Sequence, residues 1–160
     1  MKPLISNIIT AVTGSDASIM AAKYAIVLAK SYHCHLSAVY VVDTATIKQL
    51  TLSKIFIQEE GIEYEQSLTA TGNRHLSFVE ELAHAKGVKI EKILRKGAVW
   101  TEILTVAEEH KADVIVLGGW ENNRSARDII GHAHREIMIG AKCSVLLVKD
   151  PGIDKMYKHL

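Results

Sequence analysis

The stretch from Asp113 to Lys149 decides the fold of this chain. It begins with the apolar run Val114-Ile115-Val116-Leu117, followed by Gly118-Gly119, and it closes with Val145-Leu146-Leu147-Val148. Two such unbroken apolar runs predict strands that are buried on both faces of a parallel sheet. A polar loop and a helical pattern carrying Gly131 and His132 lie between them. A buried strand that ends in glycines before a helix start is how α/β folds build anion sites.

Length and charge limit the kind of protein this is. The chain has 160 residues, 48% of them apolar and 23% charged, as expected for one globular domain. Its formal net charge of +1 gives no drive toward nucleic acid or acidic membranes. No run approaches the roughly 18 apolar residues of a membrane span, and residues 1–7 are too short and polar for a secretory signal. We therefore expect a cytoplasmic protein, in which Cys34 and Cys143 are reduced core thiols.

Three further strands are predicted N-terminal to this stretch, at Asn7–Val12, Leu36–Val42 and Val88–Leu94. Lysines and a glutamate within Val88–Leu94 are typical of a sheet edge. Segments with apolar residues at helical spacing separate the strands. This alternation predicts an open α/β sheet of five parallel strands with helices on both faces.

The segment from Thr44 to Thr71 is the least regular part of the pattern. Gly61 and Gly72 interrupt it. The helix that follows could begin near Ile62 or only after Gly72, and the sequence leaves both starts open.

Two loops follow predicted strands, Thr13–Ser18 and Gly118–Arg127. Because ligands bind at the carboxyl ends of parallel strands, both loops could line one crevice. Arg124 and Arg127 lie close to a predicted helix start, where arginine forks and free N–H groups suit phosphate. Each exposed contact of this kind contributes only about 0.3–1 kcal/mol. A micromolar site needs roughly 8 kcal/mol, so a buried base or ribose contact would have to supply the rest.

Other chemistries lack their motifs. The sequence has no P-loop, no G-x-G-x-x-G fingerprint and no G-x-S-x-G elbow. On a strand, Cys34 would point away from its neighbours His33 and His35, which argues against a metal site. His132 and His134 would lie about 200° apart on a helix, so they do not share a ligand, and we expect His134 to be a solvated surface residue.

The segments above resemble the universal stress protein (UspA-type) family in their order and spacing. Ile8–Ser15 is similar to its opening strand and Gly-Ser turn, Ala112–Gly118 to its fourth strand, and Ala141–Val148 to its last strand. Gly97, Ile103 and Ala107 match the spacing of its third helix. The resemblance covers residues 1–150. It leaves 151–160 as a polar tail, which we expect to be frayed or packed on a dimer mate.

This resemblance implies a sheet with the strand order 3-2-1-4-5 in a cytoplasmic homodimer. Members of the family commonly pair through the last strand, here Ser144 to Lys149. An apolar edge strand is also a pairing liability that a partner would relieve. The resemblance names no other protein partner.

ATP-binding members of the family carry an acidic residue where this chain has Thr13. They also carry G-x-x-G, nine residues, then G-[ST]; Gly118 and Gly131 match this pattern, whereas Glu121 and His132 depart from it. A carboxylate is lost and a glutamate adds repulsion in the phosphate loop, although a protonated histidine could attract phosphate.

The candidate nucleotide-binding residues are therefore those that the resemblance implies, together with the two arginines at the predicted helix start: Thr13, Val41, Gly118, Arg124, Arg127, Gly131 and His132. Because the pattern is degenerate, we expect a non-catalytic stress-response protein that acts through binding and requires no cofactor. The alternative is a switch that binds ATP or AMP through a rearranged phosphate loop and hydrolyses ATP slowly.

Overall fold

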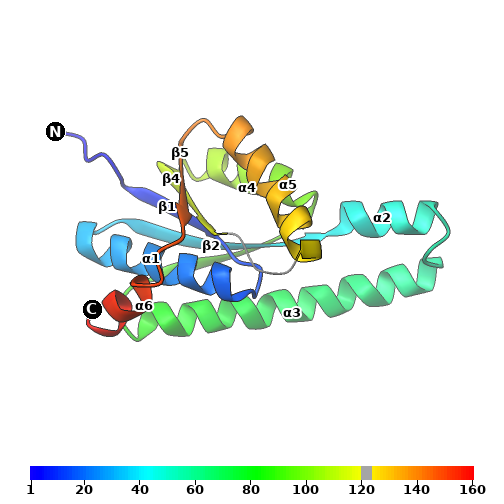
Figure 1. Cartoon of the computed structure of the whole chain (residues 1–160), viewed down its shortest axis with the longest axis horizontal. Coiled ribbons are helices and arrows are strands. Elements are labelled where there is room, and N and C mark those ends of the chain that lie inside the picture. Colours follow the sequence, from blue (N-terminus) through cyan, green and yellow to red (C-terminus); the bar gives the residue numbers. More distant parts are fainter. Residues whose placement is uncertain (120–123) are drawn as a thin grey trace.

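A parallel sheet of five strands forms the centre of the molecule (Figure 1). The computed structural model describes residues 1–119 and 124–160, and for 124–130 the backbone alone. The strands are β1 (Asn7–Ala11), β2 (His35–Asp43), β3 (Ile90–Gly97), β4 (Val114–Gly118) and β5 (Ser144–Val148). Their order in the sheet is β3-β2-β1-β4-β5, which confirms the predicted fold class and strand order. β3 lies at one edge, as its charged side chains indicated, and β5 lies at the other.

Helices cover both faces of the sheet. They are α1 (Asp16–Tyr32), α2 (Thr44–Leu52), α3 (Gln58–His84), α4 (Val99–Glu109), α5 (Arg124–Gly140) and α6 (Ile153–Lys158). Successive residues of a strand point to opposite faces. Ile8 therefore packs with α1, whereas its neighbour Ile9 packs with α4 and α5. No helix among the described residues is long and apolar enough to cross a membrane.

A carboxylate joins the amino ends of β1 and β4. Asp113, just before β4, accepts hydrogen bonds from the backbone N–H groups of Ser6 and Asn7, at 2.7 and 2.9 Å. These hydrogen bonds hold the pKa of Asp113 below its usual value. The contact fixes where the two central strands begin relative to each other.

The start of α3 differs from both sequence-based alternatives. The helix begins at Gln58, before Ile62, and it runs through Gly72 without a break. Gly72 lies against the ring of Tyr40 on β2, and a Cβ atom at Gly72 would overlap that ring. The glycine is therefore a site of close helix–sheet packing, which is why it does not end the helix.

The C-terminal tail also differs from its prediction. It is not frayed, and it packs against its own chain. Residues 153–158 form α6, which packs on α1 with Ile153 and Tyr157 buried in the same core. The Tyr157 hydroxyl donates to the carbonyl oxygen of Leu82 at 2.7 Å. Two buried side chains and this hydrogen bond explain why a short polar segment is ordered.

Candidate functional site

The turn between β1 and α1 lies at the carboxyl end of β1, where ligands bind in sheets of this kind. Ser15 caps α1 by accepting from the N–H of Ser18 at 3.2 Å. The exposed Thr13 hydroxyl lies 2.9 Å from that of Ser15. Gly14 adopts a φ of 84° and leaves room for the ring of His75, which a Cβ atom would overlap. The turn is thus built from contacts within the chain.

Ser18 occupies the inside of this turn. Its buried hydroxyl accepts from the N–H groups of Thr13 and Gly14, at 3.2 and 3.1 Å, and donates to the carbonyl of Ser15 at 3.0 Å. Backbone N–H groups of a turn are the groups that usually receive a phosphate. Here two of them already have a partner, so this turn offers less to an anion than its position suggests.

Gly118, the last residue of β4, lies directly beneath the first turn of α1. A Cβ atom on Gly118 would lie 2.6 Å from the carbonyl carbon and oxygen of Ala17. The two loops that were expected to share a crevice are therefore in contact. The cavity between them, lined by Thr13, Ser18 and Gly118 among others, holds only about 20 Å³. This is room for about one water molecule and not for a phosphate group.

His134 corrects the sequence-based expectation of a solvated residue. It is only 9% exposed, and its Nε2 lies 2.7 Å from the carbonyl oxygen of Gly118. Because a carbonyl oxygen only accepts, Nε2 carries the hydrogen and donates a hydrogen bond to this oxygen. The helical wheel placed His134 away from His132 correctly, but it could not show which of the two faces the end of β4.

A second pocket, of about 510 Å³, opens beside this crevice at the carboxyl ends of β2 and β3. Asp43, half-buried Trp100 and exposed His132 line it from three different elements. The carboxylate of Asp43 caps α2 by accepting from the N–H and hydroxyl of Thr46, at 3.0 and 2.7 Å. The pocket thus has an aromatic wall, a carboxylate and a histidine.

The predicted site residues do not come together at one place. Thr13 and Gly118 meet at the closed crevice, whereas His132 lines the second pocket. Val41 is a half-buried core residue of β2, on the same side of the strand as Asp43, and Gly131 is a half-buried residue of α5. The side chains of Arg124 and Arg127 are not among the described parts of the structure, and neither is any part of Glu121. Of these residues, Arg124 begins α5.

Sequence reasoning did not select Asp43, Trp100 or His134 as site residues. Asp43 carried a usable signal, because it directly follows the apolar run of β2 and so ends a strand, as Gly118 does. Trp100 and His134 lie within helical patterns, where only the direction of the helix decides what they face.

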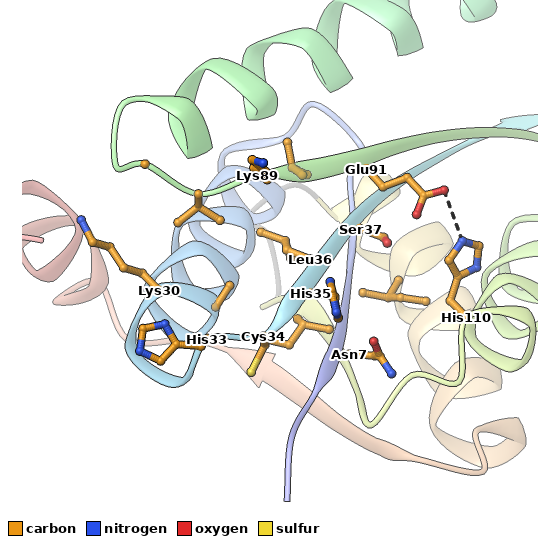
Figure 2. A pocket seen from close by; sticks show the side chains of 16 residues that line it. Asn7, Lys30, His33, Cys34, His35, Leu36, Ser37, Lys89, Glu91 and His110 are labelled. Atoms are coloured by element: carbon orange, nitrogen blue, oxygen red, sulfur yellow. Dashed lines mark ion pairs between the residues drawn. The ribbon is translucent and has the colours of Figure 1, made fainter. Parts of the chain in front are cut away.

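A larger cavity, of about 620 Å³, lies at the amino ends of β1, β2 and β3 (Figure 2). Glu91 and His110 form an ion pair of 3.5 Å at one end of it, and His33-Cys34-His35 runs along its wall. The Cys34 thiol donates to the carbonyl of Ile5 at 3.3 Å. The described residues include no group of three or more His, Cys, Asp or Glu side chains that could hold a metal ion.

The two cysteines are poor nucleophiles at neutral pH. Burial raises the pKa of both Cys34 and Cys143, and the nearby charge of Asp113 raises it further. A raised pKa leaves little thiolate, which is the reactive form. Thiol chemistry at either position is therefore not supported.

The comparisons with known proteins agree with this geometry. Residues 5–149 match the sequence pattern of the Universal stress protein family. The chain belongs to the universal stress protein family. The Universal stress protein MJ0531 of Methanocaldococcus jannaschii is 33% identical to it over 151 residues, covering 92% of this chain and 84% of that protein.

Solved structures share the fold of this universal stress protein. The structure of MJ0577 superposes with a TM-score of 0.74 at 19% identity, covering 92% of this chain and 98% of its own. A universal stress protein in complex with cAMP superposes with a TM-score of 0.66 at 21% identity, covering 90% and 96%. At such identities the likeness concerns the fold, and the binding properties of this universal stress protein have to be argued from its own residues.

Proposed function

We propose that this universal stress protein is a cytoplasmic homodimer that acts by binding rather than by catalysis, and that its adenine-nucleotide site is degenerate. The observation that carries the proposal is the narrow space at the carboxyl ends of β1 and β4, where the described residues leave about 20 Å³. Ala17 fills the room above Gly118, and Ser18 satisfies two N–H groups of the turn. A triphosphate would have to displace the first turn of α1 before it could use this turn.

The chemistry at the end of β1 supports the same proposal. The side chain at this position is the hydroxyl of Thr13, which already has Ser15 as a partner. A hydroxyl carries no charge with which to hold a metal-bound phosphate, whereas a carboxylate would. Magnesium-dependent ATP binding therefore lacks one of its usual contacts here.

The second candidate function is a nucleotide-binding switch that uses the pocket beside the crevice. Its volume of about 510 Å³ falls in the range of ordinary small-molecule sites. Trp100 could stack on a base, Asp43 could accept from a ribose hydroxyl, and His132 could meet a phosphate when protonated. The structural neighbour in complex with cAMP makes a nucleoside monophosphate the first ligand to test.

One experiment separates the two functions. Purified protein is heated, and the released supernatant is compared with adenine nucleotide standards. ATP, AMP and cAMP are then titrated calorimetrically with and without magnesium. The degenerate site predicts no co-purified nucleotide and dissociation constants weaker than about 10 μM, equivalent to about 7 kcal/mol.

Stoichiometric nucleotide, or tighter binding, would refute the degenerate site and establish the switch. The variant Trp100→Ala then locates the ligand. It should weaken a nucleotide bound in the pocket beside β2 and β3, and it should leave unchanged one bound over Gly118.

The dimer part of the proposal rests on β5. This strand lies at an edge of the sheet, where no other described strand pairs with it, and it carries three consecutive half-buried apolar residues, Val145, Leu146 and Leu147. Pairing with a second β5 would satisfy the edge hydrogen bonds. We expect Val145→Lys or Leu147→Lys to halve the mass measured by light scattering, whereas Tyr32→Lys, at an exposed apolar residue on α1, should not. An unchanged mass for folded β5 variants would exclude this strand as the interface.

A further inference from the structure

Residues 44–69 form a helical hairpin that projects beyond the sheet (Figure 1). It consists of α2, the linker 53–57 and the first half of α3. The second half of α3 packs along the sheet, and in its first half Leu68 reaches the core and Glu65 pairs with Lys96 of β3 at 3.1 Å. The hairpin extends past the carboxyl ends of the strands. We call this segment the projecting hairpin.

The projecting hairpin has an ordered interior of its own. Gly61 is buried against α2, and a Cβ atom there would lie 3.1 Å from the hydroxyl of Thr51 and 3.4 Å from Ile47. Phe56 of the linker stacks edge-on against Tyr64 of α3, with 5.7 Å between the ring centroids. Close helix contact and an aromatic pair give the hairpin a defined shape, which an interface requires.

Large apolar side chains gather at its far end. Leu52, Ile55, Ile57, Ile62 and Tyr64 are exposed by 74, 65, 60, 51 and 45%. All five fall within 13 consecutive residues, whereas no stretch of that length outside the hairpin carries more than two such residues in the described chain. Isolated exposed residues of this kind are normal, but a concentration of them marks an interaction surface.

Charged residues of both signs flank these side chains. Lys48 and Lys54 lie on α2 and in the linker, and Glu59, Glu60 and Glu63 lie on the first turns of α3. All five are exposed, and none makes an ion pair with a residue that the structure describes. Each copy of the hairpin thus carries basic and acidic side chains that have no ion-pair partner among the described residues. Glu60 in addition caps α3 by accepting from the N–H of Ile57 at 3.5 Å.

We propose that the projecting hairpin pairs with the same hairpin of a second copy of this chain. A two-fold arrangement would set Lys48 and Lys54 of one copy against Glu59, Glu60 and Glu63 of the other, and would join the apolar ends. Such self-complementarity is the property of an interface between identical chains. Two antiparallel hairpins would form a four-helix bundle, which buries the outer faces of both.

A lipid surface fits these side chains less well. Three glutamates against two lysines give the far end of the hairpin a net negative charge, which anionic membranes repel. The hairpin contact uses a surface separate from β5, so it would join two β5-paired dimers into a tetramer. Each of the two contacts can therefore be removed without the other, and each removal alone would leave a dimer.

The first test measures mass by light scattering for the full chain and its variants. Ile55→Glu with Ile62→Glu should halve the mass, and the same change at Tyr32, which is 67% exposed on α1, should leave it unaltered. Combined with Leu147→Lys, the hairpin variant should be a monomer. Circular dichroism checks that each variant is folded. A folded hairpin variant with the mass of the parent would overturn the proposal.

A charge-reversal test identifies the partner. One variant carries Lys48→Glu and Lys54→Glu, and a second carries Glu59→Lys, Glu60→Lys and Glu63→Lys, both in the Leu147→Lys background. Each variant should be monomeric alone, and the mixture should form a one-to-one dimer. Raising the salt concentration at least tenfold should weaken this association. If neither variant lowers self-association, or the mixture does not associate, the hairpin does not pair with itself.

Discussion

Nε2 of His134 lies 2.7 Å from the carbonyl oxygen of Gly118, and the contact joins α5 to the last residue of β4. The same glycine lies beneath Ala17 at the start of α1. One residue at the end of a central strand therefore holds two helices in place. The space that the described residues leave between these helices is only about 20 Å³ as a result.

Gly118→Ala should destabilise the protein because its Cβ atom would overlap the backbone of Ala17, which cannot turn aside. We expect a loss of about 2 kcal/mol in the free energy of unfolding, as for an overpacked core. Urea denaturation measures it. Gly140→Ala is the control, because its Cβ atom would meet only the end of the Leu104 side chain and should cost less than about 1 kcal/mol. Equal losses would contradict the packing role of Gly118.

Ser18→Ala should leave the N–H groups of Thr13 and Gly14 without their partner. An unsatisfied buried group costs about 1–3 kcal/mol, so we expect a loss of about 2 kcal/mol in thermal or urea unfolding. Ser67→Ala, at an exposed position on α3, serves as the control. A loss no larger than that of the control would mean that the turn does not depend on Ser18.

Thr10→Val should stabilise the protein. Thr10 is fully buried in β1, and its hydroxyl has no hydrogen-bond partner among the described residues. A methyl group of the same shape removes the desolvation cost, and we expect a gain of about 1 kcal/mol. Thr101→Val, on an exposed part of α4, should give no comparable gain. A lower unfolding midpoint for Thr10→Val would show that the hydroxyl has a partner.

Protonation of Asp113 in acid should lower the free energy of unfolding. Its folded-state pKa is lowered by the N–H groups of Ser6 and Asn7, so the ionised carboxylate favours the folded state. This stabilisation is complete above the unfolded pKa of about 3.9 and is lost as the pH falls through the folded pKa. Urea midpoints between pH 7 and pH 2.5 should therefore converge for the wild type and Asp113→Asn. A constant difference across this range would show that the charge is not responsible, and Glu59→Gln controls for the loss of a surface carboxylate.

The sequence pattern determined which segments form the sheet, and the family resemblance implied their order. The run at 114–117 is apolar without interruption, and those at 7–12 and 36–42 are apolar except for Asn7, Thr10 and Ser37. Strands covered on both faces need such side chains, and that pattern is local. The charged residues of β3 likewise marked an edge. Thr13 and Gly118 could be selected because strand ends are visible in the sequence, and the ends of neighbouring parallel strands meet at one edge of the sheet.

Only the tertiary structure decided what those positions do. Gly72 interrupts a helical pattern in the sequence, but the ring of Tyr40, 32 residues earlier, requires the glycine inside α3. His134 looked solvated because the sequence gives its angle around α5 but not the direction in which the helix faces. The sequence suggested that the backbone at Gly118 is open to a ligand, but the backbone of Ala17 lies against it. Each of these outcomes depends on contacts between residues far apart in the chain, and such contacts leave no period in the sequence.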